Sequence, residues 1–208
     1  MLFDVTRCGL AALFGEDRLA TLPATSFPPG AADTEGARLL RSVGAPAGTL
    51  FLREPDEDDG RLPLVREVVH VEAFEAFEEA AAGAGEWPVI GWLLNAHLAL
   101  DPASGKVFAF DPDEETAREL HTDVSSLIQV ALRFQRLLEE FTFSGEEDDE
   151  EADFERLDRE VERIRQETSA IDPLPFQDDE TVWSVVGEEI AAGQRFTAAT
   201  PGGRSLHG

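Results

Sequence analysis

The segment from residue 89 to 111, VIGWLLNAHLALDPASGKVFAFD, constrains the fold of this chain more than any other segment. Two apolar runs, residues 94–100 and 107–110, flank a turn cluster at residues 101–106 that contains a proline and a glycine. Proline fixes φ and glycine tolerates a positive φ, so this cluster predicts a tight connection between two antiparallel strands. Because the apolar face of such a hairpin needs a cover, we expect it to pack against a helix.

A suitable helix is predicted directly downstream, with Asp123 as its N-terminal cap. Apolar side chains recur there at intervals of three and four residues, which is typical of an amphipathic helix. The apolar face is wide, which indicates burial, and the polar face is not basic, which argues against a helix lying on a membrane. The stripe contains Val124, Leu127, Ile128, Val130, Ala131, Leu132, Phe134, Gln135, Leu137, Leu138 and Phe141.

Helical and extended patterns alternate along the rest of the chain. Caps, glycine stops and Asp-Pro breaks predict helices over residues 5–14, 34–43, 152–168 and 181–192. Short strands are predicted over residues 18–23, 49–53 and 64–71, and a further helical pattern begins at residue 73 and must end at Gly83 or Gly85.

Length and charge limit the organisation and the partners. A chain of 208 residues, of which 42% are hydrophobic, suits one domain over residues 1–196, with an acidic loop at about 144–151 and a flexible tail at 197–208. The 43 Asp and Glu residues outweigh 17 Lys and Arg residues and give a net charge of −26. Such a charge repels nucleic acid and anionic membranes and favours a basic partner, although it also serves solubility alone.

The single cysteine, Cys8, excludes an internal disulfide, and a reducing cytoplasm is the expected location. No apolar run approaches the ~18 residues of a spanning helix, and the N-terminus lacks the pattern of a signal peptide. We expect a soluble protein that binds neither membrane nor nucleic acid.

The sequence contains no complete motif for phosphate binding, metal binding or nucleophilic catalysis. Gly105-Lys106 suggests a phosphate-binding loop, but Leu100 and Val107 occupy the positions that need glycine and Ser or Thr. The four histidines show no metal-ligand spacing, and Cys8 is expected to be an inert small hydrophobe in an apolar helix. A metal site built from His97, Asp101 and Asp111 is disfavoured, because both aspartates precede proline and suit turns. We therefore expect no enzyme, no metal and no cofactor.

Several motifs in a fixed order carry a resemblance to a known family. They are FGEDRLATLP, SVGAP, TLFL, LALDPASGKVFAFD, TDVSSLIQVALRFQRLL and a terminal Asp-Pro element followed by a Trp-bearing helix. In this order the chain resembles the SUKH superfamily, specifically its fourth group of bacterial immunity proteins, over residues 5–193. The resemblance implies an α+β fold, with a mixed, mainly antiparallel twisted sheet around a central hairpin and helices that cover it.

The resemblance also implies a role in binding. Proteins of this superfamily neutralise cognate toxin domains of polymorphic toxin systems inside the producing bacterial cell, and those toxins include nucleases and nucleic-acid deaminases. An acidic protein suits such a partner, because a domain that holds phosphates presents Lys and Arg. The alternative is a non-enzymatic regulatory adaptor or scaffold that holds an endogenous basic partner.

Three groups of residues are candidates for contact with a partner. Two are acidic clusters, and for the longer one a solvated linker is the simpler interpretation. The third is a pair of tryptophans at the start of the hairpin, where an exposed ring would make a good interface anchor and an apolar neighbourhood favours burial. The candidates are Asp56, Glu57, Asp58, Asp59, Glu146, Glu147, Asp148, Asp149, Trp87 and Trp92.

Overall fold

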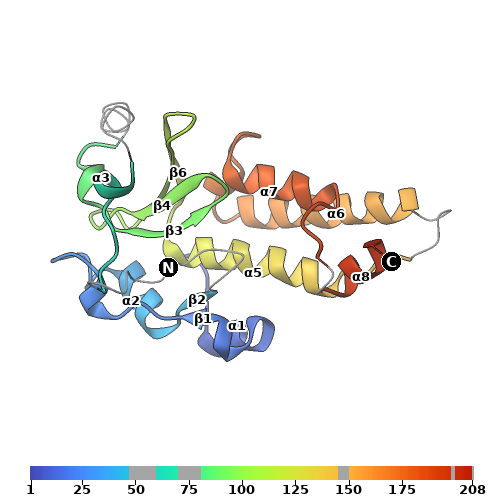
Figure 1. Ribbon diagram of the computed structural model, residues 1–208, viewed down its shortest axis with the longest axis horizontal. Coiled ribbons are helices and arrows are strands. Elements are labelled where there is room, and N and C mark those ends of the chain that lie inside the picture. Colours follow the sequence, from blue (N-terminus) through green and yellow to red (C-terminus); the bar gives the residue numbers. More distant parts are fainter. Residues whose placement is uncertain (47–59, 70–80, 145–149, 198–199, 208) are drawn as a thin grey trace. The chain divides into compact units, whose positions relative to one another are not determined.

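The computed structural model describes residues 1–46, 60–69, 81–144, 150–197 and 200–207 (Figure 1). The chain divides into two compact units, Met1–Gln129 and Val130–Gly208. The predicted α+β class is confirmed, with several helices and two sheets whose described strand pairs are all antiparallel. The expectation of one domain over residues 1–196 stays a prediction.

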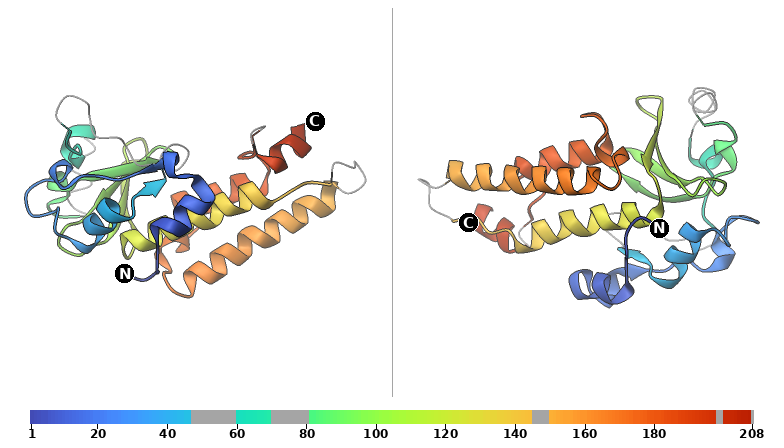
Figure 2. Two further views of the ribbon diagram at one scale, coloured as in Figure 1. Left: turned by 90° about the horizontal axis from the view of Figure 1, so that it is seen from below. Right: turned by 180° about the vertical axis from the view of Figure 1, so that it is seen from behind.

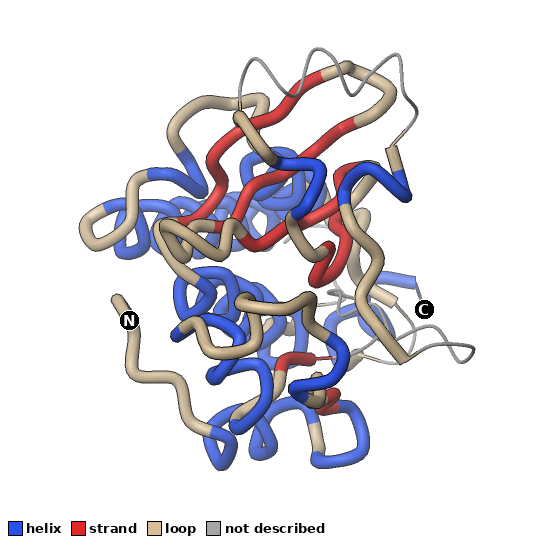
Figure 3. The backbone as a smooth tube through the Cα atoms, turned by 90° about the vertical axis from the view of Figure 1, so that its left-hand side faces the viewer, coloured by secondary structure: helices blue, strands red, loops and turns tan. Residues whose placement is uncertain are grey.

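A four-stranded antiparallel sheet is the centre of the first unit (Figure 3). The predicted hairpin is confirmed as its two middle strands, in which Leu98 lies opposite Ala109. The outer two strands were not predicted, because one continues the apolar run of the hairpin and the other, TARELH, is polar and mostly half-buried. In sheet order the strands are β3 (Val89–Leu93), β4 (Ala96–Leu100), β5 (Val107–Asp111) and β6 (Thr116–His121).

The N-terminal elements follow the sequence prediction. Helix α1 (Arg7–Phe14) ends at Gly15, and helix α2 (Glu35–Ser42) begins after Thr34, whose hydroxyl accepts a hydrogen bond from Ala37 N–H. The strand predicted at 18–23 is present as β1 (Leu19–Ala20), which pairs in a small antiparallel ladder with β2 (Ala45–Pro46), a strand after α2 that was not predicted. Local capping chemistry is therefore sufficient to set these elements.

The strand predicted over residues 64–71 is wrong where the structure describes it. Val65–Val68 forms a single helical turn, α3, and only Leu64 makes an isolated bridge, to Pro88. The Glu67 carboxylate accepts a hydrogen bond from Leu64 N–H at 2.8 Å and so caps the turn. That local bond outweighs the strand preference of the valines. The strand expected at 49–53 and most of the helical pattern after residue 73 lie outside the described residues.

Both faces of the sheet are covered within the first unit. On one face, Trp87 packs against Phe108 and Phe110 in a cluster that includes Val65 of α3. On the other, Leu100 of β4 and Val124 lie against Gly36 of α2. The sheet is therefore a two-sided core, which explains why its middle strands read as continuous apolar runs.

The helix predicted after Asp123 is confirmed as α5 (Val124–Glu140), which begins in the first unit and continues into the second. The described residues of the second unit form three further α-helices: α6 (Glu150–Ser169), α7 (Val182–Ala191) and α8 (Pro201–His207). Figure 2 shows α6 and α7 running side by side. In the core of this unit Trp183 stacks on Phe134 with ring centroids 5.7 Å apart.

Residues 201–207 at the chain end form the short helix α8. The flexible tail expected over residues 197–208 stays a prediction. Thr200 supplies the cap, since its hydroxyl accepts a hydrogen bond from Gly203 N–H at 3.1 Å, and Pro201 fits the first helical position. Phe143 N–H also donates to Ser205 Oγ at 3.1 Å. A Thr-Pro start before small residues thus encodes a short helix here.

Candidate partner-binding surface

The structure separates the two tryptophans that the sequence proposed together. Trp87 is 9% exposed, and its ring lies 4.8 Å from that of Phe108, so it belongs to the core. Trp92 is 50% exposed, which makes it one of the large hydrophobic residues that the described surface presents to solvent. Of the two, only Trp92 can act as an interface anchor.

The position of Trp92 in the sheet explains its exposure. Trp92 pairs with His97, His97 pairs with Phe110, and Phe110 pairs with Ala117, so these four residues form one row across the sheet. Residues directly opposite one another project from the same face. Phe110 is fully buried under the core cluster, whereas Trp92 stands at the end of the row on the edge strand β3.

An acidic turn lies at the same end of the sheet as Trp92. In a meander, the connection from β3 to β4 and the connection from β5 to β6 meet at one end, and the second carries Asp113, Glu114 and Glu115. All three are exposed. We call this region the Trp92 surface and define it as Trp92, Asn95, Asp113, Glu114 and Glu115.

Both turns of the Trp92 surface contain a residue with left-handed backbone conformation. Leu94 has a φ of 55° and Glu115 has a φ of 50°, which L-residues other than Asn and Asp seldom adopt. The Asp111 carboxylate fixes the second turn by accepting hydrogen bonds from Asp113 N–H at 2.9 Å and Glu114 N–H at 3.2 Å. The turn that presents the three acids is therefore held in one shape by its own residues.

A second acidic surface belongs to helix α6. Arg156, Arg159 and Arg163 make ion pairs with acids of the same helix, as in the contact of Arg163 with Glu160 at 2.6 Å and with Glu167 at 3.0 Å. The exposed acids therefore dominate this helix. The predicted clusters at Asp56, Glu57, Asp58 and Asp59 and at Glu146, Glu147, Asp148 and Asp149 lie outside the described residues and stay predictions.

Groups that suggested chemistry in the sequence have structural roles. Lys106 Nζ contacts both carboxylate oxygens of Glu119 at 2.7 Å, and Asp101 accepts a hydrogen bond from Ala103 N–H within the turn. His121 is fully buried, with Nδ1 2.9 Å from Ser126 Oγ. Cys8, expected to be an inert small hydrophobe, is a free and exposed cysteine on α1. Among the described residues no cluster of His, Cys, Asp and Glu could hold a metal ion.

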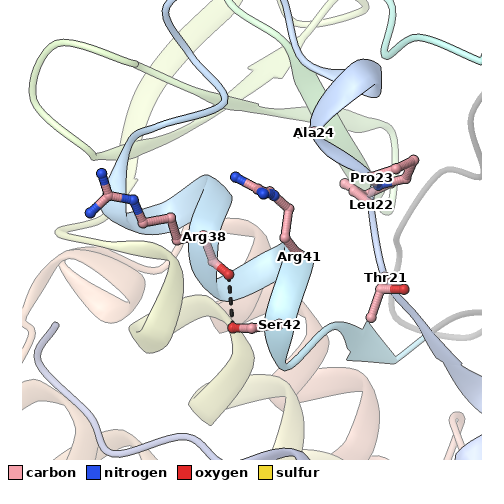
Figure 4. A pocket seen from close by; sticks show the side chains of 7 residues that line it. All are labelled: Thr21, Leu22, Pro23, Ala24, Arg38, Arg41 and Ser42. Atoms are coloured by element: carbon pink, nitrogen blue, oxygen red, sulfur yellow. Dashed lines mark hydrogen bonds between the residues drawn. The ribbon is translucent and has the colours of Figure 1, made fainter.

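Sequence reasoning missed a groove beside helix α2 (Figure 4). Residues 21–24 form one side of it and α2 the other, with a volume of about 810 Å³. We call it the α2 groove; it is lined by Thr21, Leu22, Pro23, Ala24, Arg38, Arg41 and Ser42. Two arginines three residues apart on a helix are a visible pattern, but the net charge of −26 directs attention to the acids instead.

No helix in the described part of the chain is both long enough and apolar enough to cross a membrane. This agrees with the hydropathy of the sequence, in which the longest apolar patterns are amphipathic.

The comparisons with known proteins give one match. The family model described as SUKH-4 immunity protein matches residues 5–189, from just before α1 to near the end of α7. No curated protein matches, and no solved structure matches. The matched span covers most of the chain and both compact units. The chain belongs to the SUKH-4 immunity protein family.

Proposed function

We propose that this protein binds a cognate toxin domain and blocks it inside the bacterial cell that produces both. Membership of the SUKH-4 family implies an immunity function and is the observation that carries the proposal. The toxin would be a basic, nuclease-like or deaminase-like domain of a polymorphic toxin system, and the complex would form in the cytoplasm. The role is binding alone, without catalysis by this chain.

The Trp92 surface is the part of the described chain best suited to the contact. A half-exposed Trp supplies a large apolar area at small entropic cost, and tryptophan is enriched among the residues that dominate binding energy. The neighbouring turn adds Asp113, Glu114 and Glu115, which match a surface rich in Lys and Arg. An aromatic centre with a charged border is the usual arrangement of a specific interface.

Charge supports fast capture of such a toxin. A chain of net charge −26 attracts a basic domain over a distance, and steered association reaches roughly 10⁸–10⁹ M⁻¹s⁻¹ at low salt. The same charge repels nucleic acid, so the protein would meet the toxin without competing for its substrate. Speed matters here because the free toxin harms the cell that makes it.

The test is co-expression with the cognate toxin domain. Cells that carry the toxin with the wild-type protein are expected to grow, and cells that carry the toxin alone are expected to stop growing. Trp92→Ala should lose protection and weaken binding of the purified toxin by about 30-fold or more, as for a hot-spot residue. Ile171→Ala is the matched control, because Ile171 is also exposed, at 48%. Growth that does not depend on this protein would contradict an immunity role.

A further inference from the structure

The α2 groove carries positive charge on a strongly acidic protein. Arg38 and Arg41 are both exposed and lie three residues apart on α2, so their side chains leave the same side of the helix. Within the described part of the chain, neither guanidinium makes an ion pair. Arg41 Nη1 donates to the carbonyl of Ala32 at 3.2 Å, which holds its side chain back along the helix.

This arrangement differs from that of most other cations in the described part of the chain. Ion pairs take up most of the described basic side chains, and a chain with 43 acids could easily supply two more. Glu35, three residues before Arg38, instead contacts the N-terminal ammonium at 3.4 Å. The basic residues in ion pairs are Arg7, Arg61, Arg66, Lys106, Arg133, Arg136, Arg156, Arg159, Arg163 and Arg195.

We infer that the α2 groove binds a carboxylate-bearing segment of the toxin, with Arg38 and Arg41 pairing with its Asp or Glu side chains. This inference rests on the proposed immunity function. Two neighbouring cations repel each other until an anion lies between them, and the planar guanidinium matches a carboxylate through two parallel hydrogen bonds. Leu22, Pro23 and Ala24 form the apolar wall opposite the helix, against which the aliphatic part of such a segment could pack.

The charge of the whole protein selects the kind of anion. Nucleic acid presents a continuous row of phosphates, which a chain of net charge −26 repels. A single acidic loop on an otherwise basic protein is not repelled in this way, because the rest of that protein is attracted. One positive groove on an acidic protein also fixes the orientation of the partner, because a reversed complex would place arginine against arginine or lysine.

A first experiment needs no toxin. The Nε–Hε NMR signals of the arginines are followed while a tetraglutamate peptide is added to millimolar concentration. The signals of Arg38 and Arg41 are expected to shift, while those of Arg136 and Arg159, which are exposed but paired with Glu140 and Glu155, stay in place. Equal shifts at all four arginines, or none, would overturn the inference whatever the toxin does.

A second experiment uses the full-length protein and the purified toxin domain. Arg38→Glu with Arg41→Glu is expected to weaken binding by about 30-fold or more, and Arg38→Lys with Arg41→Lys by less. Arg136→Glu with Arg159→Glu makes the same change in net charge, which should leave attraction to a basic toxin unchanged or stronger. If both charge-reversed variants bind the toxin equally weakly, or if Arg38→Glu with Arg41→Glu binds it as well as wild type, the inferred role of the α2 groove is wrong. If the wild-type protein does not bind the toxin, the proposed function fails, and the peptide titration still decides the groove.

Discussion

Gly36 of α2 leaves no space for a side chain beside Val124 of α5. A Cβ atom built on Gly36 would stand 2.6 Å from Val124 Cγ2, a distance that real Cβ atoms do not reach. We expect Gly36→Ala to lower the free energy of unfolding by about 1–2 kcal/mol, because overpacking outweighs the gain in helix propensity. Urea denaturation measures this loss. The same substitution in a Val124→Ala background should cost much less, and an equal loss in both backgrounds would assign the effect to another cause.

Asp123 connects the N-terminus to the start of α5. Its carboxylate accepts hydrogen bonds from Leu2 N–H at 2.6 Å, Ser126 N–H at 3.0 Å and Ser125 Oγ at 2.6 Å. Burial alone would raise the pKa of this carboxyl, but these hydrogen bonds outweigh burial and lower the pKa. Asp123→Ala is expected to remove about 1–2 kcal/mol of stability at pH 7. Because the folded-state pKa is depressed, the difference from wild type should shrink as the pH falls below the ordinary Asp value. The exposed Asp4→Ala should change little.

The pKa of the Glu67 carboxyl can be measured directly. Two hydrogen bonds from the Arg61 guanidinium, at 2.7 and 2.8 Å, and one from Leu64 N–H lower the pKa of Glu67 from 4.5 to about 2. The charged carboxylate therefore stabilises α3 above pH 4.5, and this contribution is lost between pH 4.5 and about 2. NMR titration of the Glu67 carboxyl should show the low pKa in wild type and a value closer to 4.5 in Arg61→Gln. A titration near 4.5 in wild type would contradict the bidentate contact.

The predictable parts of this fold are those that local chemistry sets. The turn after β4 needs a positive φ at Gly105 and a carboxylate at Asp101, and both are visible in the sequence and present in the structure. The cap at Asp123 and the apolar stripe after it predict α5 in the same way. Family and fold class follow from the order of such local signals.

The remaining features depend on tertiary context. Trp87 and Trp92 have similar neighbours in the sequence, but one lies under α3 and the other on an edge strand, so only the sheet order tells them apart. The side chains of strand β6 are mostly half-buried, so its sequence lacks the alternation of apolar and polar residues that predicts a strand. The α2 groove was missed because a residue list does not show which arginines make no ion pair with the other described residues after folding.

Glu115 occupies a strained position in the acidic turn. Its φ of 50° costs an L-residue with a long side chain roughly 1–2 kcal/mol, whereas Asn tolerates this conformation. We expect Glu115→Asn to raise the free energy of unfolding by about 0.5–1 kcal/mol in urea. Glu114→Asn makes the same change in charge at a residue with negative φ and should have a smaller effect. Equal increases in the two variants would show that relief of charge repulsion, and not backbone strain, is responsible.

Substitution by alanine is expected to affect stability very differently at Trp92 and at Trp183. Trp183 is fully buried and stacked on Phe134, so Trp183→Ala should lower the free energy of unfolding by about 3–5 kcal/mol. Trp92 is 50% exposed, so Trp92→Ala should stay within about 0.5 kcal/mol of wild type, as for a surface position. Acrylamide quenching of tryptophan fluorescence checks the exposure directly, since Trp92→Phe should remove most of the quenchable emission. If Trp92→Ala weakens the toxin complex while the fold keeps its stability, the lost energy belongs to the interface, whereas a large loss of stability would show that Trp92 supports the sheet and is no anchor.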